Sequence, residues 1–148
     1  MVNVEVQFVA SVQDTPEENE FRSWANAVES TVAGQQEAAI RIVDEAEMAE
    51  LNFQYRKKNG PTNVLSFPAQ LHEEIDIPFI GDVIICASIV AKEALEQGKS
   101  LESHWAHMTV HGILHLQGYD HIDDGDANKM ENLEIQIMNK LGFENPYV

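Results

Sequence analysis

Three histidines near the C-terminal end have the spacing of a metal site. His111 and His115 are four residues apart in a stretch with a helical pattern, so their rings lie on one face and can reach the same ion. Gly118 follows where this helix should end, and glycine tolerates the left-handed conformation that lets a chain turn back. His121 can then close on the same point. Three imidazoles leave the fourth zinc position to water, as in catalytic sites, so the pattern predicts one Zn²⁺ per chain.

Two further histidines precede this group in the same predicted helix. His107 lies eight residues before His115, which is ~12 Å along a helix axis, so a straight helix cannot bring both to one tetrahedral ion. We therefore interpret His107 as a residue that packs or supports the ligands from behind, and His104 as a surface residue near the helix start. Imidazole sites accept nickel as well as zinc, so Ni²⁺ can substitute in the predicted site.

The spacing of the histidines equals that of the metzincin peptidases, H-E-x-x-H-x-x-G-x-x-H. Those enzymes have a glutamate as general base where this chain has Gly112. A zinc-bound water can still be acidified to a pKa of ~7, but peptide hydrolysis loses its usual proton shuttle. Phosphodiester cleavage depends more on stabilising charge in the transition state. A zinc ion beside an arginine suits that reaction, and a metzincin-type zinc peptidase is the alternative.

The pattern of apolar residues predicts the elements that must position this site. Alternating or continuous apolar residues predict strands over 2–10, 38–43, 63–67 and 80–86. Helical spacing and capping residues predict helices that open at Thr15-Pro16 and at Asp44, and further helices over 87–97, 101–117 and 128–141. The expected fold is α/β (α+β), a small mixed sheet of about four strands packed by about five helices. We expect one domain over 1–148, with the metal site at the end of a long helix.

Size and composition favour a cytoplasmic protein. No apolar run approaches the ~20 residues of a membrane span, and the N-terminal residues lack the pattern of a signal peptide. Cys86 is the single cysteine of the 148 residues, so no intrachain disulfide can form. No membrane partner is expected.

The net charge of −16 limits how the chain can bind nucleic acid, because nucleic-acid-binding proteins are usually basic. Lysines and arginines cluster once, at Arg56-Lys57-Lys58. Any role on RNA must therefore rest on a local positive site and the metal. The charge also suits a third function, a non-catalytic protein in which the metal only fixes structure and which binds a basic protein partner.

Six stretches of the sequence resemble the bacterial YbeY family. They are HGILHLQGYDH at 111–121, LNFQYR with PTNVLSFP at 51–56 and 61–68, GDVIIC at 81–86, and MENLE with LGF at 130–134 and 141–143. The resemblance implies a zinc-dependent, single-strand-specific endoribonuclease. It also implies that His111, His115 and His121 hold zinc and that Arg56 is the functional arginine of the cleft.

The same resemblance implies a substrate and partners. It implies action on precursor ribosomal RNA, especially the 3′ end of the small-subunit RNA, and a part in ribosome quality control. The ribosome or ribosomal proteins are the expected partners, and no DNA is expected. Arg56 also has a purely structural interpretation, as a solvated residue that stabilises the last carbonyl groups of its helix.

Overall fold

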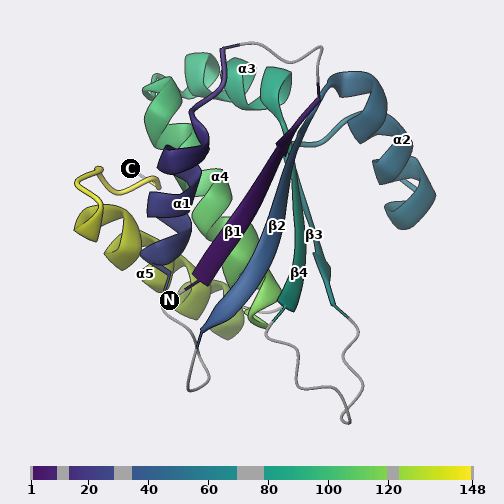
Figure 1. Ribbon diagram of the computed structural model, residues 1–148. Coiled ribbons are helices and arrows are strands. Elements are labelled where there is room, and N and C mark those ends of the chain that lie inside the picture. The colour runs from purple at the N-terminus through teal and green to yellow at the C-terminus, as the bar shows by residue number, and fades with distance from the viewer. Residues whose placement is uncertain (1, 10–13, 29–34, 70–78, 120–123, 148) are drawn as a thin grey trace, which may run out of the picture.

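The computed structural model describes residues 2–9, 14–28, 35–69, 79–119 and 124–147, and within them it contains four strands and five helices (Figure 1). The predicted fold class, a mixed α/β layer structure, is confirmed. In chain order the elements are β1 (Val2–Phe8), α1 (Glu18–Asn26), β2 (Gln36–Val43), α2 (Glu45–Arg56), β3 (Val64–Pro68), β4 (Phe79–Cys86), α3 (Ala87–Gln97), α4 (Leu101–Leu116) and α5 (Asp124–Lys140).

The sheet has the order β1-β2-β4-β3, with β3 at one edge. β1, β2 and β4 run parallel, and β3 pairs antiparallel with β4, with Leu65 opposite Ile84. Alternate side chains of β4 enter two different clusters: Val83 and Ile85 on one face, Ile84 and Cys86 on the other. The apolar run over 80–86 therefore belongs to an inner strand covered on both faces, as the sequence predicts.

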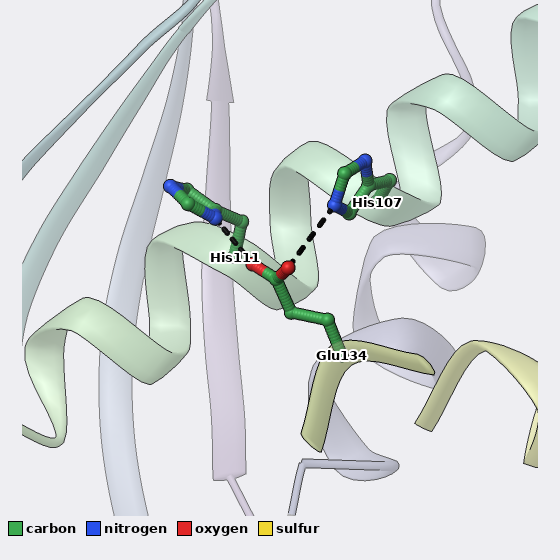
Figure 2. A group of neighbouring side chains, drawn as sticks. All are labelled: His107, His111 and Glu134. Atoms are coloured by element: carbon green, nitrogen blue, oxygen red, sulfur yellow. Dashed lines mark hydrogen bonds and ion pairs between the residues drawn. The ribbon is translucent and has the colours of Figure 1, made fainter. Parts of the chain in front are cut away.

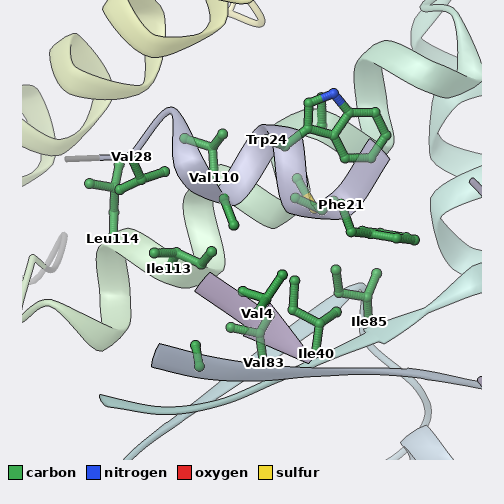
Figure 3. Packing of buried hydrophobic residues seen from close by; sticks show 14 of the residues in the cluster. Val4, Phe21, Trp24, Val28, Ile40, Val83, Ile85, Val110, Ile113 and Leu114 are labelled. Carbon is green, nitrogen blue, oxygen red and sulfur yellow. The ribbon is translucent and has the colours of Figure 1, made fainter. Parts of the chain in front are cut away.

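The two faces of the sheet are covered unequally. Met48 of α2 forms a small buried cluster with residues of the sheet, Leu65 and Cys86 among them, on one face. The larger core lies on the other face, where α1 and α4 cover the sheet (Figures 1 and 3). Phe21 of α1 meets Trp105 of α4 edge to face there, with ring centroids 5.6 Å apart. This packing fixes α4, the helix that carries the histidines, against the sheet.

α4 is stabilised by a capped first turn and by burial along most of its length. The Ser100 hydroxyl accepts a hydrogen bond from the backbone N–H of Ser103 at 3.1 Å, which caps the first turn. From residue 104 onward nearly all of its residues are buried, because α1, α3, α5 and the sheet surround it. In the structure this helix ends at Leu116, one residue before the end of the range 101–117 that the sequence predicts.

Two predicted helix starts were wrong. α1 begins at Glu18 rather than next to Thr15, because the backbone N–H of Glu17 donates to the Glu20 carboxylate at 3.0 Å and closes the first turn there. α5 begins at Asp124, four residues before the predicted start at 128. The polar loop predicted over 69–78 lies almost wholly outside the described residues.

Within the part of the chain that the structure describes, no helix combines the length and the apolar character needed to cross a membrane.

Candidate metal centre

His111 and His115 face each other on the last two turns of α4. Their Nε2 atoms lie 3.1 Å apart and their ring centroids 4.6 Å apart. Two nitrogen ligands of tetrahedral zinc, each at ~2.0–2.1 Å, are separated by about 3.3 Å. The two rings therefore fit one ion with little rearrangement. His121, the third predicted ligand, lies outside the described residues.

Gly118 ends the helix in the left-handed conformation that the sequence predicts, with φ of 99°. The N–H of Gly118 donates to the carbonyl of His115 at 3.0 Å, and the N–H of Tyr119 donates to that of Leu114 at 3.1 Å. These bonds satisfy carbonyl groups of the last turn. The chain therefore turns back directly after His115.

Gly118→Val should destabilise this turn. A Cβ at Gly118 would have open space around it, so the expected cost of ~1–3 kcal/mol comes from forcing a β-branched residue to positive φ. Zinc should also bind more weakly, because the segment that carries His121 leaves this turn. Urea unfolding and a chelator competition measure both effects. Gly118→Asn is the control, because asparagine tolerates this conformation. A valine variant with parental stability and zinc affinity would show that the turn does not depend on glycine.

A buried glutamate supports His111 from the side away from His115. One oxygen of the Glu134 carboxylate accepts a hydrogen bond from His111 Nδ1, and the other contacts His107 Nε2 at 3.4 Å (Figure 2). The Tyr147 hydroxyl donates to the same carboxylate. Burial alone would raise the pKa of Glu134, but the hydrogen bonds from these three side chains and the charge of His111 lower it to about 2. Glu134 is therefore an ionised carboxylate inside the protein.

His107, His111 and Glu134 are themselves close enough to hold a metal ion, since one donor atom from each lies within 4.8 Å of the others. The sequence predicts only a packing or supporting role for His107 and no role for Glu134. The sequence contained a signal for Glu134, because it lies four residues from both Met130 and Met138 and so shares a helix face with them. The structure buries all three residues. A carboxylate on the apolar face of a helix needs a partner.

His104 is not a surface residue, so that prediction was wrong. It is 3% exposed, and its Nε2 lies 2.9 Å from the carboxylate of Glu93 on α3. The prediction assumed that the start of a helix is exposed, whereas α3 packs across the start of α4. Glu93 also accepts a hydrogen bond from the Asn63 amide at 3.1 Å, which links α3 to the start of β3.

A cavity of about 660 Å³ opens beside the histidine pair. It lies between the end of α4 and the edge strand β3, and Arg56 at the end of α2 borders it as well. Its described lining consists of Arg56, Thr62, Asn63, Val64, Ser66, Pro68, His111, His115, Gly118 and Tyr119. The structure thus brings Arg56, His111 and His115 to one cavity. Arginine is the one permanent charge of this described lining.

Gly112 has a structural reason to lack a side chain. A Cβ there would lie 2.5 Å from a methyl group of Val83, since α4 packs tightly on β4 at this point. The Ser66 hydroxyl also donates to the Gly112 carbonyl at 3.0 Å, which ties β3 to α4. The position that carries the general base in metzincins is therefore pressed against the sheet, and a glutamate would have no room at Gly112.

The chain is similar to known proteins over most of its length. The family model of the endoribonuclease YbeY matches residues 5–142. Among solved structures, the chain is similar to the solution structure of TM1509 from Thermotoga maritima, at 25% sequence identity and a TM-score of 0.61. That match covers 96% of this chain and 92% of the Thermotoga chain. The chain belongs to the YbeY endoribonuclease family, a family of nucleases with a role in ribosomal RNA maturation.

Proposed function

We propose that this protein is a zinc-dependent, single-strand-specific endoribonuclease whose metal is held by His111, His115 and His121. The observation that carries the proposal is the shared cavity, in which Arg56 stands with the two facing imidazoles of α4. A zinc ion bound there would acidify a water molecule and polarise a phosphate oxygen. The family supplies the class of reaction, cleavage of RNA phosphodiesters.

In the proposed reaction Arg56 binds the scissile phosphate. It is exposed at the end of α2, and the described residues provide no hydrogen-bond or ion-pair partner for its guanidinium. A guanidinium can donate two parallel hydrogen bonds to a phosphate and keeps its charge at any working pH. Arg56 would thus orient the phosphate toward the histidine pair and stabilise the charge that develops on it.

The surface next to Arg56 suits a single strand. Phe53 and Tyr55 are each 58% exposed, and the Tyr55 ring packs edge to face on Phe67 at 5.1 Å. Lys57 and Lys58 are exposed at the same end of α2. Exposed rings beside positive charges are how proteins bind single-stranded nucleic acid, with bases stacked and phosphates neutralised. This local chemistry offsets the overall charge of −16.

We further propose precursor ribosomal RNA as the substrate, with cleavage at the 3′ end of the small-subunit RNA and a part in ribosome quality control. The proposed partners are the ribosome or its proteins, and the proposed compartment is the cytoplasm. The support is the family resemblance of the motifs. A non-catalytic ribosome assembly factor is the second candidate, because a charge of −16 favours a basic protein partner. A zinc peptidase is disfavoured by the packing of Gly112 against Val83.

The direct test is cleavage of matched single-stranded and duplex RNAs by the zinc-loaded protein. We expect the single strand to be cut and the duplex to be spared, with activity lost on chelation and restored by zinc. His115→Ala, purified in parallel, should be inactive, since it removes one imidazole of the facing pair. Equal cleavage by His115→Ala would reveal a contaminating nuclease. A parent protein that binds zinc but leaves RNA intact would favour the assembly-factor function.

A further inference from the structure

Glu134 is fully buried, and hydrogen bonds engage both of its oxygens. Oε1 accepts from Nδ1 of His111, while Oε2 lies 3.4 Å from His107 Nε2 and accepts from the Tyr147 hydroxyl. The side chain is 0% exposed. A buried carboxylate with three partners can rotate only if several hydrogen bonds break together. Glu134 is therefore a fixed acceptor behind the ring of His111.

The contact at Nδ1 determines what the other side of the His111 ring can do. A neutral imidazole carries one proton, so a ring that donates from Nδ1 has its lone pair on Nε2. Nε2 is the atom that lies 3.1 Å from Nε2 of His115. Carboxylates that accept from the far nitrogen of a metal-binding histidine fix its tautomer and its orientation. Glu134 stands in this relation to His111.

The end of the chain supports Glu134 from a third side. After α5 the segment that contains Tyr147 returns to the connection between α3 and α4, where the Lys99 ammonium donates to the Pro146 carbonyl. The Tyr147 ring also packs edge to face on His107, with centroids 5.3 Å apart. Its hydroxyl thus reaches the carboxylate from a segment that follows the last helix. The orientation of His111 therefore depends on residues from α4, α5 and the C-terminal segment.

We propose that Glu134 is a positioning residue of the metal centre, which holds Nδ1–H of His111 and directs Nε2 into the cavity, with His107 and Tyr147 keeping the carboxylate in place. The proposal rests on the proposed function in one respect, that His111 is a metal ligand. It differs from the arrangement in which His107, His111 and Glu134 bind the ion themselves. In that arrangement the ion would replace the hydrogen bonds that now hold the carboxylate.

The test measures zinc affinity of the full chain by competition with a chelator of known affinity. Glu134→Gln keeps the shape of the side chain but loses its charge, and we expect zinc to bind about 10–100-fold more weakly. Tyr147→Phe removes one hydrogen bond from the carboxylate, and a smaller loss in the same direction is expected. Glu96→Gln is the matched control, because Glu96 is exposed on α3 and changes the net charge equally. It should bind zinc as the parent does.

A second readout separates positioning from general stability. In the zinc-loaded parent, the Nδ1–H proton of His111 should give a distinct downfield NMR signal, because a carboxylate accepts it. Glu134→Gln should shift or remove this signal, whereas Glu96→Gln should not. Tyr147 is 46% exposed, so Tyr147→Phe is expected to fold even if Glu134→Gln does not. If Glu134→Gln fails to fold, parental zinc affinity in Tyr147→Phe would overturn the proposal.

Two results for a folded Glu134→Gln would also overturn it. Parental zinc affinity with an unchanged His111 signal would show that the carboxylate does not position the ring. Complete loss of zinc in Glu134→Gln, with zinc retained in His115→Ala, would make Glu134 a ligand. Neither readout involves RNA. Weaker zinc binding in a protein that cleaves no RNA would therefore refute the proposed function and leave this inference standing.

Discussion

Arg56→Lys should fold and bind zinc like the parent but cleave single-stranded RNA on the order of 10–1000-fold more slowly, as expected for the loss of a contact that matters most in the transition state. Lysine keeps the charge but cannot donate two parallel hydrogen bonds to one phosphate. Arg56→Ala loses the charge as well and should be slower still. Single-turnover cleavage rates at saturating enzyme measure the effect separately from RNA binding.

The position of Arg56 explains why neither substitution should harm the fold. It is the last residue of α2 and is exposed. In the structural interpretation, Arg56 would stabilise the last carbonyl groups of its helix. Lys57 is another candidate for this role, because its ammonium donates to the carbonyl of Gln54 at 3.3 Å. Thermal unfolding and zinc content of the Arg56 variants should therefore match the parent.

Lys57→Ala and Lys58→Ala are the matched controls, because both residues are exposed cations within two positions of Arg56. Arg56 belongs to the described lining of the cavity, whereas neither lysine does. Their loss should weaken RNA binding and reduce its dependence on salt, as expected of contacts to the phosphate backbone. The single-turnover rate should stay near that of the parent. Parental cleavage by Arg56→Ala would make Arg56 a surface residue and contradict the proposed mechanism.

The elements around the site could be predicted because their signals are local. The helix over 87–97 matches α3 in full, and Gly98, which follows it, has a left-handed conformation. Asp44 caps α2 as predicted, accepting from the N–H of Glu47 at 2.9 Å. A cap, an apolar period and a glycine lie within one short window of sequence. The facing of His111 and His115 is equally local, because it follows from a spacing of four.

The surroundings of the histidines could not be predicted, because they depend on packing between distant elements. Glu134 lies 23 residues from His111 in sequence, and no period or spacing connects the two. His104 was misplaced for the same reason, since its partner Glu93 belongs to the neighbouring helix. The sheet order also came only from the structure. A single sequence shows which residues share a helix face, but it does not show what that face meets.

Removal of the proposed metal ligands one at a time should identify the donor set. His111→Ala and His115→Ala should each abolish stoichiometric zinc binding, because the two Nε2 atoms at 3.1 Å would form one edge of the proposed site. His121→Ala should do the same and would test the ligand that lies outside the described residues. Elemental analysis of protein purified without a nickel column measures the content, since imidazole sites also accept nickel.

His107→Gln decides between the two donor sets of α4. A glutamine amide can still donate to Glu134, so the carboxylate keeps a partner, while the imidazole is gone. If the ion lies between His111 and His115, this variant should retain one zinc per chain. If His107, His111 and Glu134 hold the ion, His107→Gln should lose the metal and His115→Ala should keep it. The cavity favours the first outcome, because His111 and His115 line it together with Arg56, whereas His107 is absent from its described lining. Arg56, which would hold the phosphate in the proposed reaction, lines that same cavity.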